Sequence, residues 1–366
     1  MEKITNYQLF SLMVLFQIGT SSIFGFAASA GKDAWISIAL STILGSFIIA
    51  MYIVLMRLNP GLTLVEWFPA QFGRWIGTPI SWLYPLIFIY DAGRGVADLS
   101  YLIPSTLLPR TPPIVTVGLF MLVVLYGVYH GIQLLGKMAG LFLPIIFLVF
   151  IVETILLFAS KIVRLTYLLP VLDLGWGRVW GAVWPIGITQ SFAETIEFAM
   201  IWTLVKPKKK VMTTSLLATL SVGIFLASLD CLAISVLGED IFQRSIFPVY
   251  TLIQQIGVGD VIENVDVIGV LYITVNAFFK ISLHIMMATL AIQQLTYIKN
   301  RKVILFPVVF TAIFVGLTMS TSIVEHIYGV AFKILSPYFW VPLFLVLPGI
   351  LLIVIWIKKR IFKITS

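Results

Sequence analysis

The sequence predicts an all-α integral membrane protein with ten transmembrane helices. Of its 366 residues, 60% are hydrophobic and only 11% are charged, and the mean hydropathy is +1.05. Uncharged runs of about 18 or more residues recur along the chain, which is long enough to cross a bilayer as a helix. The apolar runs are continuous rather than alternating, which argues against a membrane β-barrel.

The boundaries of the apolar runs place the spans within a single transmembrane domain over residues 1–366. The ten predicted spans cover residues 7–30, 34–57, 79–108, 112–131, 135–158, 181–204, 211–238, 266–295, 303–321 and 334–357. Several of them contain proline, which membrane helices tolerate as a kink.

Charge at the span ends predicts the orientation. A lysine-rich segment, 206–210, directly follows span six. If both termini are cytoplasmic, lysines and arginines in the inner segments outnumber those in the outer segments, as the positive-inside rule requires. The even number of spans agrees with this, so we predict cytoplasmic termini. The net charge of +8 belongs to helix ends and is no sign of nucleic-acid binding.

Two long connections indicate an internal repeat. Residues 58–78 and 239–265 occupy the same place in two five-span halves, about 7–158 and 181–357. Because five is odd, the second half must lie inverted relative to the first, as in many secondary transporters. Both connections carry apolar and aromatic residues, which predict short surface helices.

Span one contains a group of small and hydroxylated residues at mid-depth: Gly19, Thr20, Ser21, Ser22 and Gly25. Glycine weakens a helix, and hydroxyl groups can satisfy backbone groups that are freed when a helix unwinds. One interpretation is a broken helix whose backbone binds a ligand resembling an amino acid. The alternative is close helix packing through small residues.

Span six has a similar group at the corresponding position, where Gly187 precedes polar residues up to Glu197. Two potential breaks at matching positions favour ligand binding, because the ends of half-helices can face a carboxylate or a cation. The predicted ligand-binding residues are Gly19, Thr20, Ser21, Ser22, Gly25, Asp98, Tyr101, Phe192, Ala193, Glu194 and Glu197.

Span three carries ionisable residues at helical spacing. Asp91, Arg94 and Asp98 are three and four residues apart and therefore share one face. For Asp91 and Arg94 we favour a structural ion-pair stripe. Asp98, with Tyr101 three residues later, is more open to a role in the site.

Glu194 and Glu197 also share one helix face, and two close carboxyl groups can share a proton. Lys280 in span eight is a natural partner for one of them, with His284 four residues after it and Asn276 four residues before it. Because an ionised group at the bilayer centre costs about 2.5–3.5 kcal/mol, these residues are expected to face the interior. The network is either a set of structural ion pairs or a proton relay.

Other ionisable residues and motifs point to no chemistry. Glu153 and Asp230 are expected to form interior pairs or to contact water, and His326 is assigned no role. The sequence has no phosphate-cradling glycine loop, no Cys/His cluster with metal-ligand spacing and no nucleophile elbow. We therefore predict no enzyme activity, no metal and no cofactor.

Short segments in a consistent order carry a resemblance to a known family. They lie at 4–8, 19–21, 31–35, 72–77, 110–112 and 169–172, followed by Ser191-Phe192 with a nearby glutamate and by the lysine-rich turn. Together they resemble the B subunit of GerA-type spore germinant receptors, a family related to amino acid–polyamine–organocation transporters. The glycine and hydroxyl residues at 19–21 fall where that family's ligand-binding break lies, and 191–197 fall at its span-six counterpart.

The resemblance implies a LeuT-like fold with broken helices one and six. It further implies a nutrient-sensing subunit in the inner membrane of the spore that binds a small germinant, commonly an amino acid. The implied partners are membrane lipid, a larger A subunit and a lipoprotein C subunit. A proton-coupled amino acid transporter is the alternative, because Glu194, Glu197 and Lys280 are titratable groups within an inverted repeat. A purely structural scaffold is less favoured, since buried charges are costly to retain.

Overall fold

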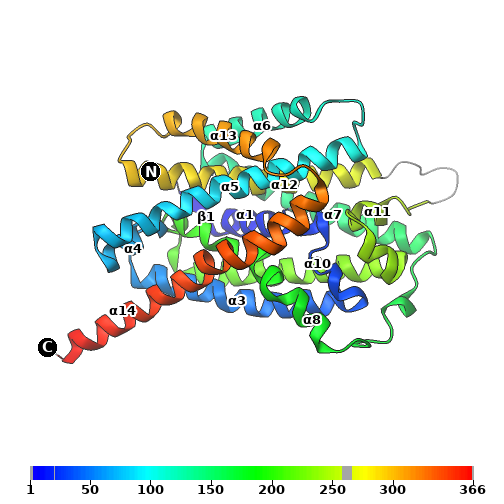
Figure 1. Cartoon of the computed structure of the whole chain (residues 1–366), viewed down its shortest axis with the longest axis horizontal. Helices are drawn as coiled ribbons and strands as arrows, with labels where there is room; N and C mark the ends of the chain where they lie inside the picture. The colour runs from blue at the N-terminus through cyan, green and yellow to red at the C-terminus, as the bar shows by residue number, and fades with distance from the viewer. Residues whose placement is uncertain (1–2, 20, 258–265, 365–366) are drawn as a thin grey trace.

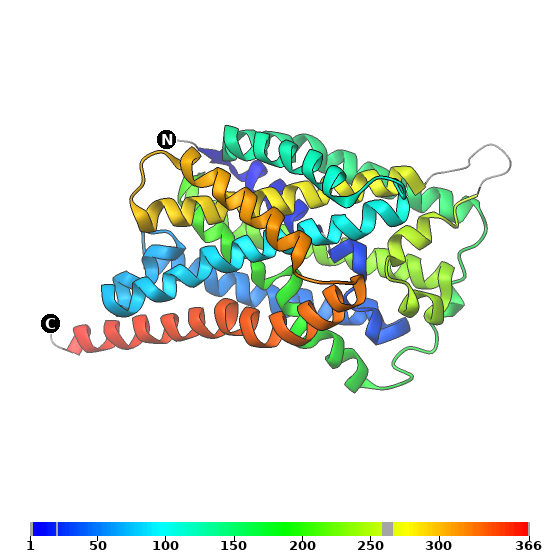
Figure 2. The same cartoon turned by 45° about the horizontal axis from the view of Figure 1, so that its top comes forward.

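The computed structural model describes residues 3–19, 21–257 and 266–364, without the side chains of 22–23, 266–268, 271–272 and 361–364. Long helices lie side by side in one bundle, and the C-terminal helix α14 projects beyond it (Figures 1 and 2). The start of α1 and the far end of α14 lie toward the same end of the bundle in both views. That placement agrees with termini on one side of a membrane.

The N-terminal part of the chain is helical from Asn6 onward. Its elements are β1 (Ile4–Thr5), α1 (Asn6–Ile18), α2 (Ser21–Phe24), the 3₁₀-helix η1 (Ala28–Asp33), α3 (Ala34–Leu58), α4 (Leu64–Phe72), α5 (Arg74–Thr106), α6 (Pro113–His130), α7 (Ile132–Ala159) and the 3₁₀-helix η2 (Leu165–Leu168).

The C-terminal part begins with short elements and continues with long helices. Its elements are α8 (Trp176–Ala182), the π-helix η3 (Val183–Gly187), α9 (Ile188–Ser191), the 3₁₀-helices η4 (Ala193–Met200) and η5 (Trp202–Leu204), β2 (Val205–Lys206), the 3₁₀-helix η6 (Lys208–Lys210), α10 (Val211–Arg244), α11 (Pro248–Ile253), α12 (Asp266–Thr296), α13 (Arg301–Thr318), the π-helix η7 (Glu325–Val346) and α14 (Leu347–Ile364).

Within the described residues, seven helices are long and apolar enough to cross a membrane, so the chain is a multi-pass, all-α membrane protein. The predicted spans outside this set are the first, third and sixth. The first and sixth are divided into short pieces, whereas α5 is continuous but carries Asp91, Arg94 and Asp98. The number ten therefore stays a prediction.

The tenth predicted span differs from the structure at its start. The sequence places its beginning at residue 334, just after Lys333, but the helix begins at Glu325 as η7 and continues into α14. The prediction treated Lys333 as a loop residue. A lysine can remain inside a helix near a membrane surface because its long stem carries the charge outward.

The N-terminal helix α1 lies at the centre of the bundle. From Leu12 to Ile18 its side chains have no exposed surface, including the polar Gln17. The helix packs against α7, α10 and α12, and α5 packs in turn on α12 and α13. The end of α1 therefore lies deep inside the protein, where water cannot easily satisfy freed backbone groups.

The two long connections each hold a short helix, as predicted. Helix α4 lies in the first connection, where Thr63 and Glu66 form a reciprocal cap at its start. Helix α11 lies in the second connection and begins with Pro248, a residue suited to the first helical turn. They pack on the bundle against α5 and α10 respectively.

A two-residue β-pair was not predicted. Ile4 and Thr5 of β1 pair in parallel with Val205 and Lys206 of β2. The pair joins the start of α1 to the chain that follows η5. It therefore connects the ends of the first and sixth predicted spans, about 200 residues apart in the sequence.

Candidate functional site

Helix α1 ends at Ile18, and α2 begins at Ser21. Between them Gly19 has φ +28° and ψ −126°, a conformation that side chains rarely adopt. A Cβ added at Gly19 would lie 2.5 Å from Lys280 Cδ and 2.6 Å from the Phe16 carbonyl oxygen. Glycine is therefore required here both by the backbone conformation and by the close approach of Lys280. Thr20 lies outside the described residues.

The sixth predicted span changes helix type along its length. The π-helix η3 contains Trp184 with φ −114° and ψ +131°, and it is followed by the single turn α9 and the 3₁₀-helix η4. Such changes leave carbonyl groups without their usual partner four residues later. One of these carbonyl groups, that of Gln190, accepts a hydrogen bond from Lys280 Nζ at 3.3 Å.

The two interrupted segments meet inside the protein. Ser191 Oγ of α9 donates to Ser21 Oγ of α2 at 2.7 Å. Lys280 of α12 contacts both interruptions, because its stem lies against Gly19 and its ammonium group reaches Gln190. The predicted break residues Gly19 and Ser21 are thus brought together with the polar residues of span six. The side chain of Ser22 is not described.

A buried ion cluster lies beside this junction. Lys280 Nζ is 2.7 Å from Glu194 Oε2, and Arg94 Nη2 is 3.4 Å from Glu194 Oε1. All three side chains are at most 3% exposed. One carboxylate is shared by two cations, so Glu194 is the electrostatic centre of the cluster.

Asp91 and Arg94 do not pair with each other as the sequence led us to expect. Asp91 Oδ1 accepts a hydrogen bond from Trp340 Nε1 at 3.1 Å, and the Arg94 guanidinium lies over the Trp340 ring at 5.0 Å. The shared helix face was correct, but Arg94 extends across to Glu194. The spacing of residues on one helix predicts which face their side chains share, but it does not predict which residue of another helix they contact.

The predicted network around Glu197 divides into separate parts. His284 Nδ1 is 2.6 Å from Glu197 Oε1, and both side chains are buried. The His284 ring meets Phe16 of α1 edge-on at 5.1 Å. Asn276 is fully buried, yet neither polar atom of its side chain has a partner in the described part of the chain. An unpaired amide in the interior is available to a ligand or a water molecule.

A second buried pair joins α5 to η7. His326 Nε2 is 2.6 Å from Asp98 Oδ1, with both side chains 1% exposed, and the Tyr101 hydroxyl donates to the Ser320 carbonyl oxygen at 3.1 Å. The sequence analysis assigned His326 no role. The available signal was an ionisable residue close to an apolar run, but nothing local linked it to Asp98, which lies 228 positions away.

The remaining predicted residues pack away from Lys280. The Ala193 carbonyl accepts from the Tyr52 hydroxyl at 3.1 Å, and Phe192 lies against Gly45 of α3. A Cβ at Gly25 would come 2.8 Å from Pro248 Cγ of α11. Gly25 is thus a packing contact, while Phe192 and Ala193 fix the turn that positions Glu194.

A cavity of about 390 Å³ opens beside the first interruption. Its lining combines Phe24 and Gly25 with Tyr328, which lies two residues from His326. Arg178, also in the lining, donates to the Ser29 carbonyl oxygen at 3.0 Å and pairs with Glu239 at 2.6 Å. This cavity gives a small polar molecule a place to approach the segment that follows Gly19.

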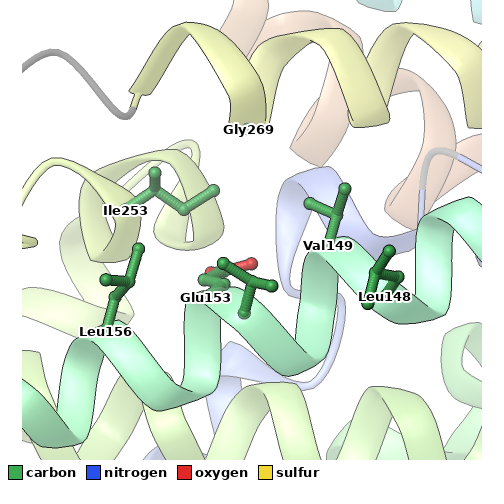
Figure 3. Close-up of a pocket in the computed structure, with 7 residues that line it drawn as sticks. Leu148, Val149, Glu153, Leu156, Ile253 and Gly269 are labelled. Atoms are coloured by element: carbon green, nitrogen blue, oxygen red, sulfur yellow. The ribbon is translucent and has the colours of Figure 1, made fainter.

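Glu153 of α7 lies apart from this cluster. It lines an apolar cavity of about 200 Å³ with Leu148, Val149, Leu156 and Ile253, and Figure 3 shows its carboxyl group among those side chains. It is 5% exposed, and its Oε1 has no hydrogen-bond partner among the described residues. Of the two expectations for Glu153, an interior pair is not found for Oε1 among the described residues, and the water contact stays a prediction.

No group of three or more His, Cys, Asp or Glu residues within the described ranges could hold a metal ion. The arrangement instead offers cations, carboxylates, an unpaired amide and irregular backbone around one junction. Those groups suit reversible binding of a small polar molecule.

Comparisons with known proteins agree with this architecture. The family model described as "Spore germination protein" matches residues 3–324. Spore germination protein KB of Bacillus subtilis is 29% identical over 98% of this chain and 96% of its own length. Spore germination protein XB of Bacillus anthracis is 24% identical over 90% of each chain. The match spans both interrupted segments and the buried cluster between them, and the chain belongs to the spore germination protein family.

Proposed function

We propose that this chain is the nutrient-sensing membrane subunit of a spore germinant receptor and that it binds a small germinant resembling an amino acid. The observation that carries the proposal is the meeting of two interrupted segments at Lys280. Irregular backbone deep in a membrane protein is tolerated where it lines a cavity or a ligand site. The names of the relatives KB and XB support a role in germination.

The proposed site offers complementary groups for an amino acid. Lys280 and Arg94 supply positive charge for a carboxylate, and the C-terminal end of α1 carries the partial negative charge that suits an ammonium group. Asn276 and Gln190 Oε1 add buried polar atoms without partners. A ligand that competes with Glu194 for the two cations would change the packing of η4 against α12. Such differential contact is what lets a ligand shift a conformational equilibrium.

We further propose a LeuT-like arrangement of ten spans in two inverted halves, about 7–158 and 181–357. It is supported by interruptions in the first span of each half and by α4 and α11, which follow the second span of each half. Both termini would be cytoplasmic, in the inner membrane of the spore. Larger A and lipoprotein C subunits would receive the signal.

A proton-coupled amino acid transporter is the second candidate. The observation in its favour is the buried His284–Glu197 pair beside the Lys280–Glu194 pair, because such groups can relay protons. Sensing and transport can use the same fold. Uptake into liposomes separates them: amino acid uptake driven by a pH gradient favours transport, and binding without uptake favours sensing.

Binding of radiolabelled amino acids to the purified chain in detergent tests the site. We expect Asn276→Leu, which keeps the side-chain size, to weaken binding about three- to tenfold by removing unpaired hydrogen-bonding groups. Glu153→Gln, in the separate cavity on α7, is the control and leaves affinity unchanged. Affinity that survives both Asn276→Leu and Gly19→Ala in folded protein would refute the assigned site. Spores lacking the chain, exposed to amino acids and sugars, identify the germinant.

A further inference from the structure

The lysine-rich segment after η5 borders a cavity that the proposed function does not use. The cavity measures about 410 Å³ and lies between the end of α3 and the η5–η6 region. Three cationic residues line it, namely Arg57, Lys208 and Lys209. In the described part of the chain no carboxylate lies within ion-pair distance of any of them, whereas Lys32 and Arg178 do have acidic partners.

Trp202 contributes its ring to the lining of the cavity. Its side chain has no exposed surface, so its indole N–H is out of reach of a bound molecule, although it has no acceptor among the described residues. The three cations are exposed, and the lining of the cavity holds no acid. Three cations in such a lining suit an anion with several oxygen acceptors.

The surface next to the cavity indicates where that anion comes from. On α3, Ile43, Phe47 and Val54 are 51%, 69% and 36% exposed, and they lie on the face that leads to Arg57. An apolar stripe that ends in a basic pocket fits a lipid whose acyl chain follows the helix and whose headgroup reaches the cations. Free phosphate would use the pocket and leave the stripe unoccupied.

We propose that Arg57, Lys208 and Lys209 bind the phosphate group of an anionic phospholipid. The site adjoins the β1–β2 pair, where Asn6 Nδ2 also donates to the Pro207 carbonyl oxygen at 3.3 Å. A bound headgroup therefore ties α3 to the segment that joins the two interrupted spans. The lipid would stabilise this end of the bundle against separation.

Native mass spectrometry of the full chain tests the proposal by measuring retained lipid. We expect phosphatidylglycerol to be retained in preference to phosphatidylcholine. This preference should decrease as the salt concentration rises, because salt screens the charges. Lys208→Gln/Lys209→Gln lowers retention about fivefold per lysine removed. The control Lys299→Gln/Lys359→Gln removes the same charge from exposed positions outside the cavity and retains the lipid.

A further variant keeps the test decisive. Arg57→Gln alone serves if the double lysine variant does not fold, and it also lowers phosphatidylglycerol retention. Equal retention of the two lipids, or full retention by the folded Arg57 or lysine variants, overturns the site. Displacement of the lipid by millimolar inorganic phosphate overturns the assignment to a lipid in favour of a free anion.

Discussion

Two buried glutamates in this protein have opposite surroundings. Glu194 contacts Lys280 at 2.7 Å and Arg94 at 3.4 Å, at the junction of the two interrupted segments. Glu153 faces an apolar cavity on α7, where its Oε1 has no partner among the described residues. Both are acids within apolar spans, and the sequence set Glu194 apart only through its neighbour Glu197 and the possible helix break before it. Both acids are buried, so their partners rather than their burial distinguish them.

The contrast also separates two energetic cases. A buried ion pair adds little net stability over well-packed apolar residues, but removing one partner leaves the other charge uncompensated. Around Glu194 two cations depend on one carboxylate, so removing that carboxylate should lower the free energy of unfolding strongly. Around Glu153 no ion pair with a described residue exists to be lost, and Oε1 makes no hydrogen bond among them.

The largest expected effect is that of Glu194→Gln. The substitution keeps the shape but removes the only acid within ion-pair distance of Lys280 and Arg94 in the described residues. We expect the free energy of unfolding to fall by about 3–5 kcal/mol, measured by denaturant unfolding of the purified chain in detergent. Adding Lys280→Met to this variant should recover part of the loss. A single variant as stable as the original chain would contradict the central role of Glu194.

Glycines in the two regions give the next comparison. Gly19→Ala places a methyl group against Lys280 and the Phe16 carbonyl oxygen at positive φ, so we expect a loss of about 1–3 kcal/mol. At Gly269, in the α7 cavity, a new Cβ would mainly meet Cδ1 of Ile253, the far end of a side chain beside open space. Gly269→Ala should be tolerated better in the same unfolding assay. If Gly269→Ala lowered the free energy of unfolding more than Gly19→Ala, the backbone at Gly19 would be able to accommodate a side chain.

Glu153→Gln should have the smallest effect. It makes the same chemical change as Glu194→Gln but breaks no contact of Oε1, so we expect the free energy of unfolding to change by less than about 1 kcal/mol. Thermal unfolding of the two glutamine variants side by side measures the difference. A large loss at Glu153 would contradict the absence of a stabilising contact at its carboxyl group among the described residues.

Local signals predicted much of the architecture. Gly19 and the polar group after Gly187 marked segments that are divided into short helical pieces, because glycine and hydroxyl residues weaken regular helices wherever they occur. The aromatic residues of the two long connections marked α4 and α11. Spacing also placed Lys280 and His284 on one face of α12, next to the acids of span six.

Partner choice was not predictable in the same way. Arg94 was expected to pair with Asp91 but reaches Glu194, 100 positions away. His326 was assigned no role but pairs with Asp98, and β1 with β2 was not foreseen. These contacts depend on how helices rotate and tilt against each other, which is set by packing over the whole bundle.

The sequence by itself determined that the chain spans a membrane as helices, where regular helix is weakest and which faces carry polar groups. These properties follow from transfer of apolar side chains and from backbone hydrogen bonding, which act over a few residues. Only the tertiary structure decided that Lys280 links the two interruptions, that Glu194 is shared by two cations and that Glu153 Oε1 has no partner among the described residues. Such choices arise from distances between segments far apart in the chain, and those distances exist only once the helices are packed.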